Sequence, residues 1–112
     1  MATDTTHSLP DEIADAPTGW QVVATSDSVV QLIDALLDLP AHREFNKTEL
    51  ADFADVSRKS VHNYIGLLLE IELITEVPDT SPQRYRFNTE SEVAELLIRL
   101  DGAVNKAGPH SE

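Results

Sequence analysis

A stretch without a single carboxylate interrupts this otherwise strongly acidic chain. The sequence has 20 Asp and Glu against 8 Lys and Arg, a formal net charge of −12, yet residues 56–69 contain no acid. Six of the eight basic residues lie within residues 43–87. Four side chains of the acid-free stretch carry donors that suit phosphates and base edges, namely Arg58, Lys59, His62 and Asn63. The chemistry predicted here is recognition of a polyanion.

The acid-free stretch has the spacing of an amphipathic helix capped by Ser57. Val61, Ile65 and Leu68 form its buried face, so the donors are expected on the opposite face. A helix in the DNA major groove presents its N-terminal residues to the base edges, where Asn pairs with adenine and Arg or Lys with guanine. The predicted DNA contacts are Lys47, Thr48, Ser57, Arg58, Lys59, Ser60, His62, Asn63, Arg84 and Arg86.

Other interpretations of the basic residues stay open. Arg58 and Lys59 could be solvated charges, although cations at a helix N-terminus oppose the macrodipole. Arg84 and Arg86 could serve only to keep an edge strand soluble.

Gly66 lies inside the predicted helix, where we expect it to permit close approach of a neighbouring helix.

The flanking segments predict further helices and a β-hairpin. Ser26 or Asp27 caps a helix to about Asp38, and residues 43–45 form a short strand. Asn46 and Glu49 form a capping box on a helix ending near Ala54. Asp55 takes left-handed backbone angles at the break before Ser57. Beyond the acid-free stretch, the pattern predicts a hairpin over residues 73–77 and 83–87, and a helix that begins at Thr89 and ends near Lys106.

This order of elements, with Ala51 at the helix crossing and Val56 after the turn, resembles a winged helix-turn-helix. Two residues depart from the pattern, because Asp55 and Glu72 stand where the family often has Gly. The chain is most similar to the small MarR-like or PadR-like regulators of halophilic archaea, among them an oxidative-stress regulator. The resemblance implies a mainly α fold with a small β-hairpin and terminal dimerisation helices. It also implies a homodimer with one recognition helix per major groove.

Two apolar helix faces are expected to form the dimer interface. The helix of residues 27–38 is apolar around most of its circumference, which suggests cover by a partner on one side. The C-terminal helix carries an apolar stripe at 4-3-4 spacing. The predicted interface residues are Val29, Ile33, Leu36, Val93, Leu97, Leu100 and Val104.

Composition narrows the class of protein. There is no cysteine, and the four histidines are scattered, so we expect no disulfide, metal site or cofactor. No paired carboxylates, nucleophile–base pair or Gly-rich phosphate loop indicates an enzyme. The sequence lacks a signal peptide and a membrane-spanning run, which predicts a cytoplasmic protein. We expect one domain over residues 19–107, with disordered tails at 1–18 and 108–112.

The dispersed acids have two explanations. They are typical of adaptation to molar salt, in which case we expect inorganic cations between the acidic protein surface and the DNA phosphates. They also fit an acidic protein–protein interaction module on a winged-helix scaffold that does not bind DNA. Such a module should carry carboxylates on the helix of residues 56–69, which this chain does not.

Overall fold

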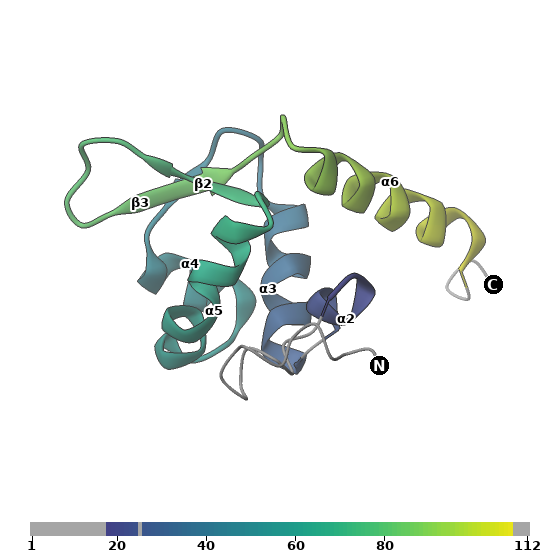
Figure 1. Ribbon diagram of the computed structural model, residues 1–112, viewed down its shortest axis with the longest axis horizontal. Helices are drawn as coiled ribbons and strands as arrows, with labels where there is room; N and C mark the ends of the chain where they lie inside the picture. The colour runs from purple at the N-terminus through teal and green to yellow at the C-terminus, as the bar shows by residue number, and fades with distance from the viewer. Residues whose placement is uncertain (1–17, 25, 109–112) are drawn as a thin grey trace, which may run out of the picture.

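The computed structural model describes residues 18–24 and 26–108 as mainly helical, with one small antiparallel sheet (Figure 1). Of the predicted tails at residues 1–18 and 108–112, residues 1–17 and 109–112 lie outside the described residues. In order, the elements are α2 (Trp20–Val23), α3 (Asp27–Asp38), β1 (Glu44–Phe45), α4 (Lys47–Ala54), α5 (Arg58–Glu70), β2 (Ile74–Val77), β3 (Arg84–Phe87) and α6 (Glu92–Ala107). No helix in the described part of the chain is both long enough and apolar enough to cross a membrane.

Local capping signals set most helix starts. The Ser26 hydroxyl accepts the Val29 amide at the start of α3, at 3.2 Å. At α4, Asn46 Oδ1 accepts the Glu49 amide at 2.8 Å, and Glu49 Oε1 accepts the Asn46 amide at 3.0 Å. The predicted capping box is confirmed, as is the left-handed residue between α4 and α5, Asp55, with φ 58°.

The start of α6 differs from the prediction, because Ser91 and not Thr89 caps the helix. The Ser91 hydroxyl accepts the Ala94 amide at 3.0 Å. Thr89 cannot do so because the chain is still turning there. Asn88 Oδ1 accepts the Glu90 amide at 3.3 Å, and the Asn88 carbonyl accepts the Ser91 amide at 3.2 Å. The first helical turn therefore forms two residues later than predicted.

The sheet contains the predicted hairpin and one additional pairing. Its order is β1-β3-β2, and both pairs are antiparallel, with Glu44 opposite Arg86 and Thr75 on the other side of Arg86. Tyr85 and Phe87 are buried, whereas Arg86 is exposed and Arg84 half-buried, which confirms the predicted alternation along this strand.

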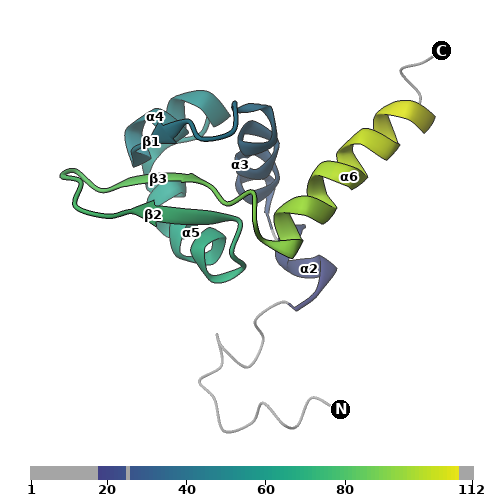
Figure 2. The ribbon, with the colours of Figure 1, turned by 90° about the horizontal axis from the view of Figure 1, so that it is seen from above.

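The hydrophobic core lies where α3, α4 and α5 meet one face of the sheet (Figure 2). Its largest fully buried side chains are Phe45, Leu32, Leu36, Leu50, Leu68, Leu73, Ile74, Val29 and Val61. Phe45 and Tyr85 stack across β1 and β3 with ring centroids 6.2 Å apart. In contrast, α6 extends away from this core: only Ala94 of α6 is buried, and Leu97 packs partly against the core (Figures 1 and 2).

Candidate nucleic-acid interface

The solvent-facing side of α5 carries the polar residues singled out in the sequence. Val61, Ile65 and Leu68 anchor the helix in the core. The residues exposed on its other side are Ser57, Arg58, Lys59, His62, Asn63, Gly66 and, at the C-terminal end of the helix, Glu70. Ser60 is half-buried. The patch formed by Arg58, Lys59, His62 and Asn63, hereafter the α5 patch, is therefore open to a ligand.

Gly66 has open space beside it, because a Cβ atom built at this position meets no atom within 4 Å. The prediction that Gly66 allows a neighbouring helix of this chain to approach is therefore wrong.

The first turn of α5 differs from those of the other long helices in its charge. Asp27 lies in the first turn of α3, Glu49 in that of α4, and Glu92 and Glu95 in that of α6. Such acids stabilise the positive end of a helix dipole. The first turn of α5 contains no acid and begins instead with Arg58 and Lys59. This end is therefore electrostatically less favourable in isolation, and it is more positive than the start of any other long helix in the described part of the chain.

Hydroxyl groups link the start of α5 to the start of α3. Ser57 caps α5, its Oγ accepting the Ser60 amide at 3.0 Å. The Ser60 hydroxyl accepts hydrogen bonds from Ser57 Oγ at 3.1 Å and from Ser28 Oγ at 3.3 Å. The two predicted contact residues Ser57 and Ser60 thus also hold the first turn of α5 in place. The Ser28 link joins residues far apart in sequence, and no local pattern indicated it.

The start of α4 lies beside the hairpin loop. Lys47 is half-buried and Thr48 exposed at the first turn of α4. Together with residues 82 and 83 of the loop they line a shallow hollow of about 240 Å³. Tyr85 closes the hollow, and burial, with a smaller contribution from Glu76, raises the pKa of this phenol. The α4 start and the hairpin loop can therefore contact the same ligand.

Arg84 is engaged inside the protein, which the sequence did not indicate. Its Nη2 donates to the Glu44 carbonyl at 3.1 Å and to Glu49 Oε1 at 3.1 Å. Its Nε lies 3.5 Å from Glu44 Oε1. Two carboxylates thus balance the charge of Arg84, and β3 is tied to β1 and to the α4 capping box.

The same contacts affect the ionisation of Glu49. The hydrogen bond from the Asn46 amide contributes most to holding the pKa of Glu49 below its ordinary value. Desolvation, the next largest effect, raises this pKa, and Arg84 and Arg43 lower it again. The folded protein therefore favours the carboxylate form of Glu49, which both caps α4 and pairs with Arg84.

Arg86 is the free cation of the hairpin within the described part of the chain. It is exposed and has no carboxylate within ion-pair distance there. It lines a hollow of about 270 Å³ with His42, Thr89 and Glu90. The alternative that Arg84 and Arg86 protect an edge strand is wrong, because β3 is the central strand of the sheet. Arg86 remains available for an external contact, whereas Arg84 is already paired with Glu44 and Glu49.

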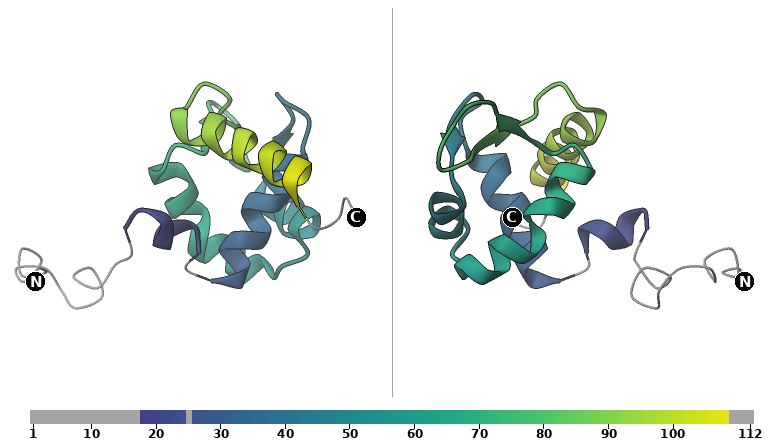
Figure 3. Two further views of the ribbon diagram at one scale, coloured as in Figure 1. Left: turned by 90° about the vertical axis from the view of Figure 1, so that its right-hand side faces the viewer. Right: turned by 60° about the vertical axis from the view of Figure 1, so that its left-hand side comes forward.

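The other side of the molecule is apolar. On α6, Val93 is 36% exposed, Leu96 50%, Leu100 44% and Val104 53%, while Leu97 is partly buried. Trp20 of α2 is 64% exposed and lines an apolar groove with the first half of this α6 face. Figure 3 shows α2 and α6 on the side of the molecule away from the hairpin loop.

The predicted contribution of α3 to a dimer interface is wrong. Val29, Ile33 and Leu36 are 0%, 5% and 1% exposed, because α4 and α5 of the same chain cover the side that was assigned to a partner. Only Val30, at 49%, presents a large apolar surface on this helix. Leu97 and the exposed residues Val93, Leu100 and Val104 remain accessible.

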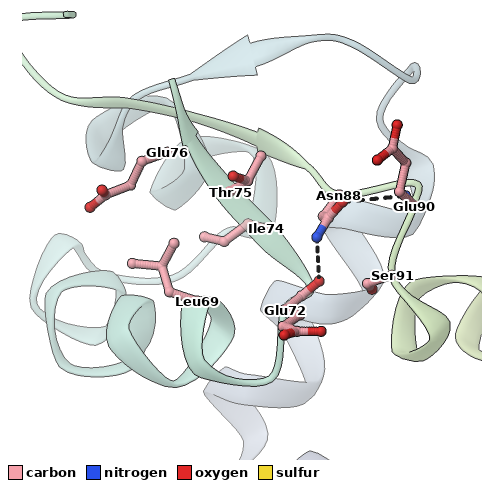
Figure 4. Close-up of a pocket in the computed structure, with 8 residues that line it drawn as sticks. All are labelled: Leu69, Glu72, Ile74, Thr75, Glu76, Asn88, Glu90 and Ser91. Carbon is pink, nitrogen blue, oxygen red and sulfur yellow. Dashed lines mark hydrogen bonds between the residues drawn. The ribbon is translucent and has the colours of Figure 1, made fainter. Parts of the chain in front are cut away.

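A further hollow is acidic. About 570 Å³ in volume, it is lined by the end of α5, by β2 and by the segment before α6, with the carboxylates of Glu72, Glu76 and Glu90 at its rim (Figure 4). Asn88 spans it, donating to the Glu72 carbonyl at 3.2 Å and accepting the Glu90 amide at 3.3 Å. Among the described residues, no three His, Asp or Glu side chains converge as metal ligands would. This hollow lacks the positive charge that a nucleic acid requires.

In comparisons with known proteins, no family model matches this chain, and neither a curated protein nor a solved structure matches it. The interpretation of the site therefore rests on the chemistry and placement of its residues.

Proposed function

We propose that this protein is a sequence-specific DNA-binding transcription regulator of the winged helix-turn-helix kind, and not an enzyme. The observation that carries the proposal is the first turn of α5. The chain has a net charge of −12. Among the long helices of residues 18–24 and 26–108, only α5 begins without an acid, and it begins with two cations on an exposed surface. A duplex phosphate or guanine edge offsets the electrostatic cost of that arrangement.

The arrangement around α5 supports the interpretation of α4 and α5 as a helix-turn-helix. Ala51 is 3% exposed where α4 meets α5, and Asp55 turns the chain between them. We infer that α5 enters the major groove, with Asn63 reading a base edge. The hairpin loop projects on the same side as α4 and α5 (Figure 1). In this proposal, the hairpin is the wing, and Arg86 is its cation for the flanking backbone or minor groove.

The α6 face supports a two-fold dimer. Val93, Leu97, Leu100 and Val104 have the same residue types and spacing when read in reverse. Two antiparallel copies of α6 would therefore pair Val93 with Val104 and Leu97 with Leu100 about a two-fold axis. A dimer also matches the paired half-sites that helix-turn-helix proteins read.

We propose a high-salt cytoplasm as the working environment, with inorganic cations bound between acidic side chains and phosphates. At molar salt the Debye length is about 3 Å, so the dispersed acids repel DNA only at short range. Ordinary phosphate contacts release counterions and weaken steeply with salt. Cation uptake at the interface opposes that release, and a shallow or inverted dependence of affinity on KCl is expected. A steep loss of affinity between ordinary and molar KCl would contradict this part of the proposal.

The test is binding of a labelled random duplex, followed by fluorescence anisotropy across a KCl series. Wild-type protein is compared with Arg58→Ala/Lys59→Ala and with Arg99→Ala/Lys106→Ala, which removes the same charge from α6. We expect the α5 variant to lose at least tenfold in affinity, since two phosphate or base contacts disappear. The α6 variant should bind as the wild type does. Equal losses in the two variants would indicate a non-specific charge effect, and no binding by the wild type would favour the acidic interaction module.

A further inference from the structure

The hydroxyl group of Tyr85 has no hydrogen-bond partner in the described part of the chain, although this side chain is only 4% exposed and its ring stacks on Phe45. Among the described residues, no fully buried side-chain oxygen or nitrogen lacks a partner. The hydroxyl is therefore the part of Tyr85 that reaches solvent, and Tyr85 lines the hollow of about 240 Å³ between the start of α4 and the hairpin loop. A nearly buried tyrosine usually bonds its hydroxyl within the fold, so this free donor indicates an external acceptor.

The start of α4 brings further donors to the same hollow. The capping box uses the amides of Asn46 and Glu49. The amides of Lys47 and Thr48, between them in the first turn, have no carbonyl four residues earlier in the helix to bond. These amides stand at the positive end of the helix dipole, and the residues that carry them line the hollow. Donors from α4 and from β3 therefore meet at one place.

The hollow is free of carboxylates. No Asp or Glu among residues 18–24 and 26–108 lines it, whereas glutamates line the two other polar hollows described above. Glu44 and Glu49, which lie close in sequence to the start of α4, are both paired with Arg84. Glu76 lies opposite Tyr85 on β2, but α4 follows β1, on the other side of β3. The lining is therefore suited to an anion.

Hydrogen bonds within the hairpin hold the loop wall of the hollow in place. Gln83 Nε2 donates to the carbonyls of Val77 and Arg84, each at 2.9 Å. Thr80 Oγ1 accepts the Arg84 amide at 2.9 Å. Because the wall is already ordered, a ligand that enters the hollow does not have to order it.

We propose that this hollow binds one phosphate group of the DNA backbone, with Lys47, Thr48 and Tyr85 as its donors. Phosphate oxygens accept hydrogen bonds from Lys, Thr and Tyr side chains and from helix N-termini. A phosphate held between α4 and β3 fixes the register of the α5 patch on the duplex. Burial and Glu76 raise the pKa of Tyr85, which keeps the phenol protonated as a donor. This inference rests on the proposed function and deepens it, because it adds an uncharged and nearly buried residue to the DNA contacts.

Tyr85→Phe tests the inference, because it removes the hydroxyl and keeps the ring that stacks on Phe45. The hydroxyl has no partner in the fold, so the urea midpoint should stay at the wild-type value. We expect about tenfold weaker binding on random duplex and on a selected site alike, as for the loss of one hydrogen bond to a charged group. Tyr64→Phe is the matched control and should bind as the wild type does, since Tyr64 is half-buried on α5 and does not line the hollow.

Methylphosphonate substitution locates the phosphate by neutralising one position of a selected site at a time. At one position in each half-site, Tyr85→Phe should add no further loss, because the charge that the hydroxyl contacts is already gone. An effect of Tyr85→Phe that persists at every neutralised position would overturn the assignment. A loss confined to the selected site would place the hydroxyl against a base edge and overturn it too.

Inorganic phosphate separates a free ligand from the DNA backbone. In NMR spectra of the wild type, random duplex should shift the amide signals of Lys47 and Thr48. Shifts with inorganic phosphate but not with duplex would make free phosphate the ligand and contradict the assignment. Wild-type affinity in Tyr85→Phe would contradict it as well, and if Arg58→Ala/Lys59→Ala still weakens binding, the proposed function stands. Failure of the wild type to bind any DNA would remove both.

Discussion

The start of α5 and the exposed half of α6 are both helix surfaces turned to solvent, but they expose opposite chemistry. The first presents Arg58 and Lys59 against the positive end of a helix dipole. The second presents Leu96, Leu100 and Val104, each between 44% and 53% exposed. Neither surface is favourable for a single chain in water. This difference is what supports the proposal of two different partners, one polyanionic at α5 and one apolar at α6.

The apolar side gives the largest expected effect. Leu96→Glu/Leu100→Glu places two charges on each α6. A two-fold interface contains α6 from both copies and would therefore contain four added charges. Each of these side chains is already about half-buried in the single chain, so a dimer gains about 1 kcal/mol from each Leu and the variant loses about 4 kcal/mol. We expect sedimentation equilibrium to show monomers, with an unchanged circular dichroism spectrum because these residues lie outside the core. Gly102→Glu adds a charge on the opposite side of α6 and should stay dimeric. A double variant that remains dimeric would place the interface elsewhere.

The polar side predicts a separation of specific from general DNA binding. Asn63→Ala should cost about 1–3 kcal/mol on a selected site and little on random duplex, because amide contacts to a base edge carry sequence information. Arg58→Ala/Lys59→Ala should weaken both. Titrations of each variant on both duplexes check this. Equal losses for Asn63→Ala on the two duplexes would refute its role as a base-reading residue.

Arg84 and Arg86 sharpen the comparison within the hairpin itself. Arg84 bonds a backbone carbonyl and Glu49, so Arg84→Ala should destabilise the fold by about 1 kcal/mol. Arg86 has no such partner, and Arg86→Ala should change the free energy of unfolding by less than about 0.5 kcal/mol. Urea denaturation measures both. Only Arg86→Ala should weaken DNA binding without a loss of stability, and the reverse pattern would exchange the two roles.

The smallest expected effect is an acid dependence at Glu49. Because the folded pKa lies below the ordinary value, the Glu49 carboxylate stabilises the fold above the unfolded-chain pKa. That stabilisation is lost as the pH falls through the lowered pKa. Glu49→Gln should therefore flatten the decrease in Tm on acidification below the ordinary Glu range. An identical pH profile in wild type and variant would show that Glu49 does not contribute.

The sequence predicts those features that depend on neighbouring residues. The capping box of Asn46 and Glu49, the Ser57 cap and the left-handed Asp55 are all local, and each is confirmed. The cap of α6 is local as well, but the prediction named Thr89 where Ser91 caps the helix. Both hydroxyls can cap a helix, and the hydrogen bonds of Asn88 favour Ser91.

Features that depend on distant residues were not predictable in the same way. The partners of Arg84 are 35 and 40 residues away in sequence. The pairing of β1 with β3 likewise joins segments that are far apart in the chain. The burial of Val29, Ile33 and Leu36 depends on how α4 and α5 cross α3, which hydrophobic periodicity does not specify. Periodicity identifies an apolar face but not whether the same chain or another covers it.

The most direct test of the DNA-binding claim is selection of duplexes from a random pool at molar KCl, with wild-type protein and Asn63→Ala in parallel. We predict that the wild type enriches a two-fold symmetric sequence, and that Asn63→Ala loses preference at a single position in each half-site. A pool that stays random with the wild type, or a motif unchanged by Asn63→Ala, would contradict the assignment of the α5 patch.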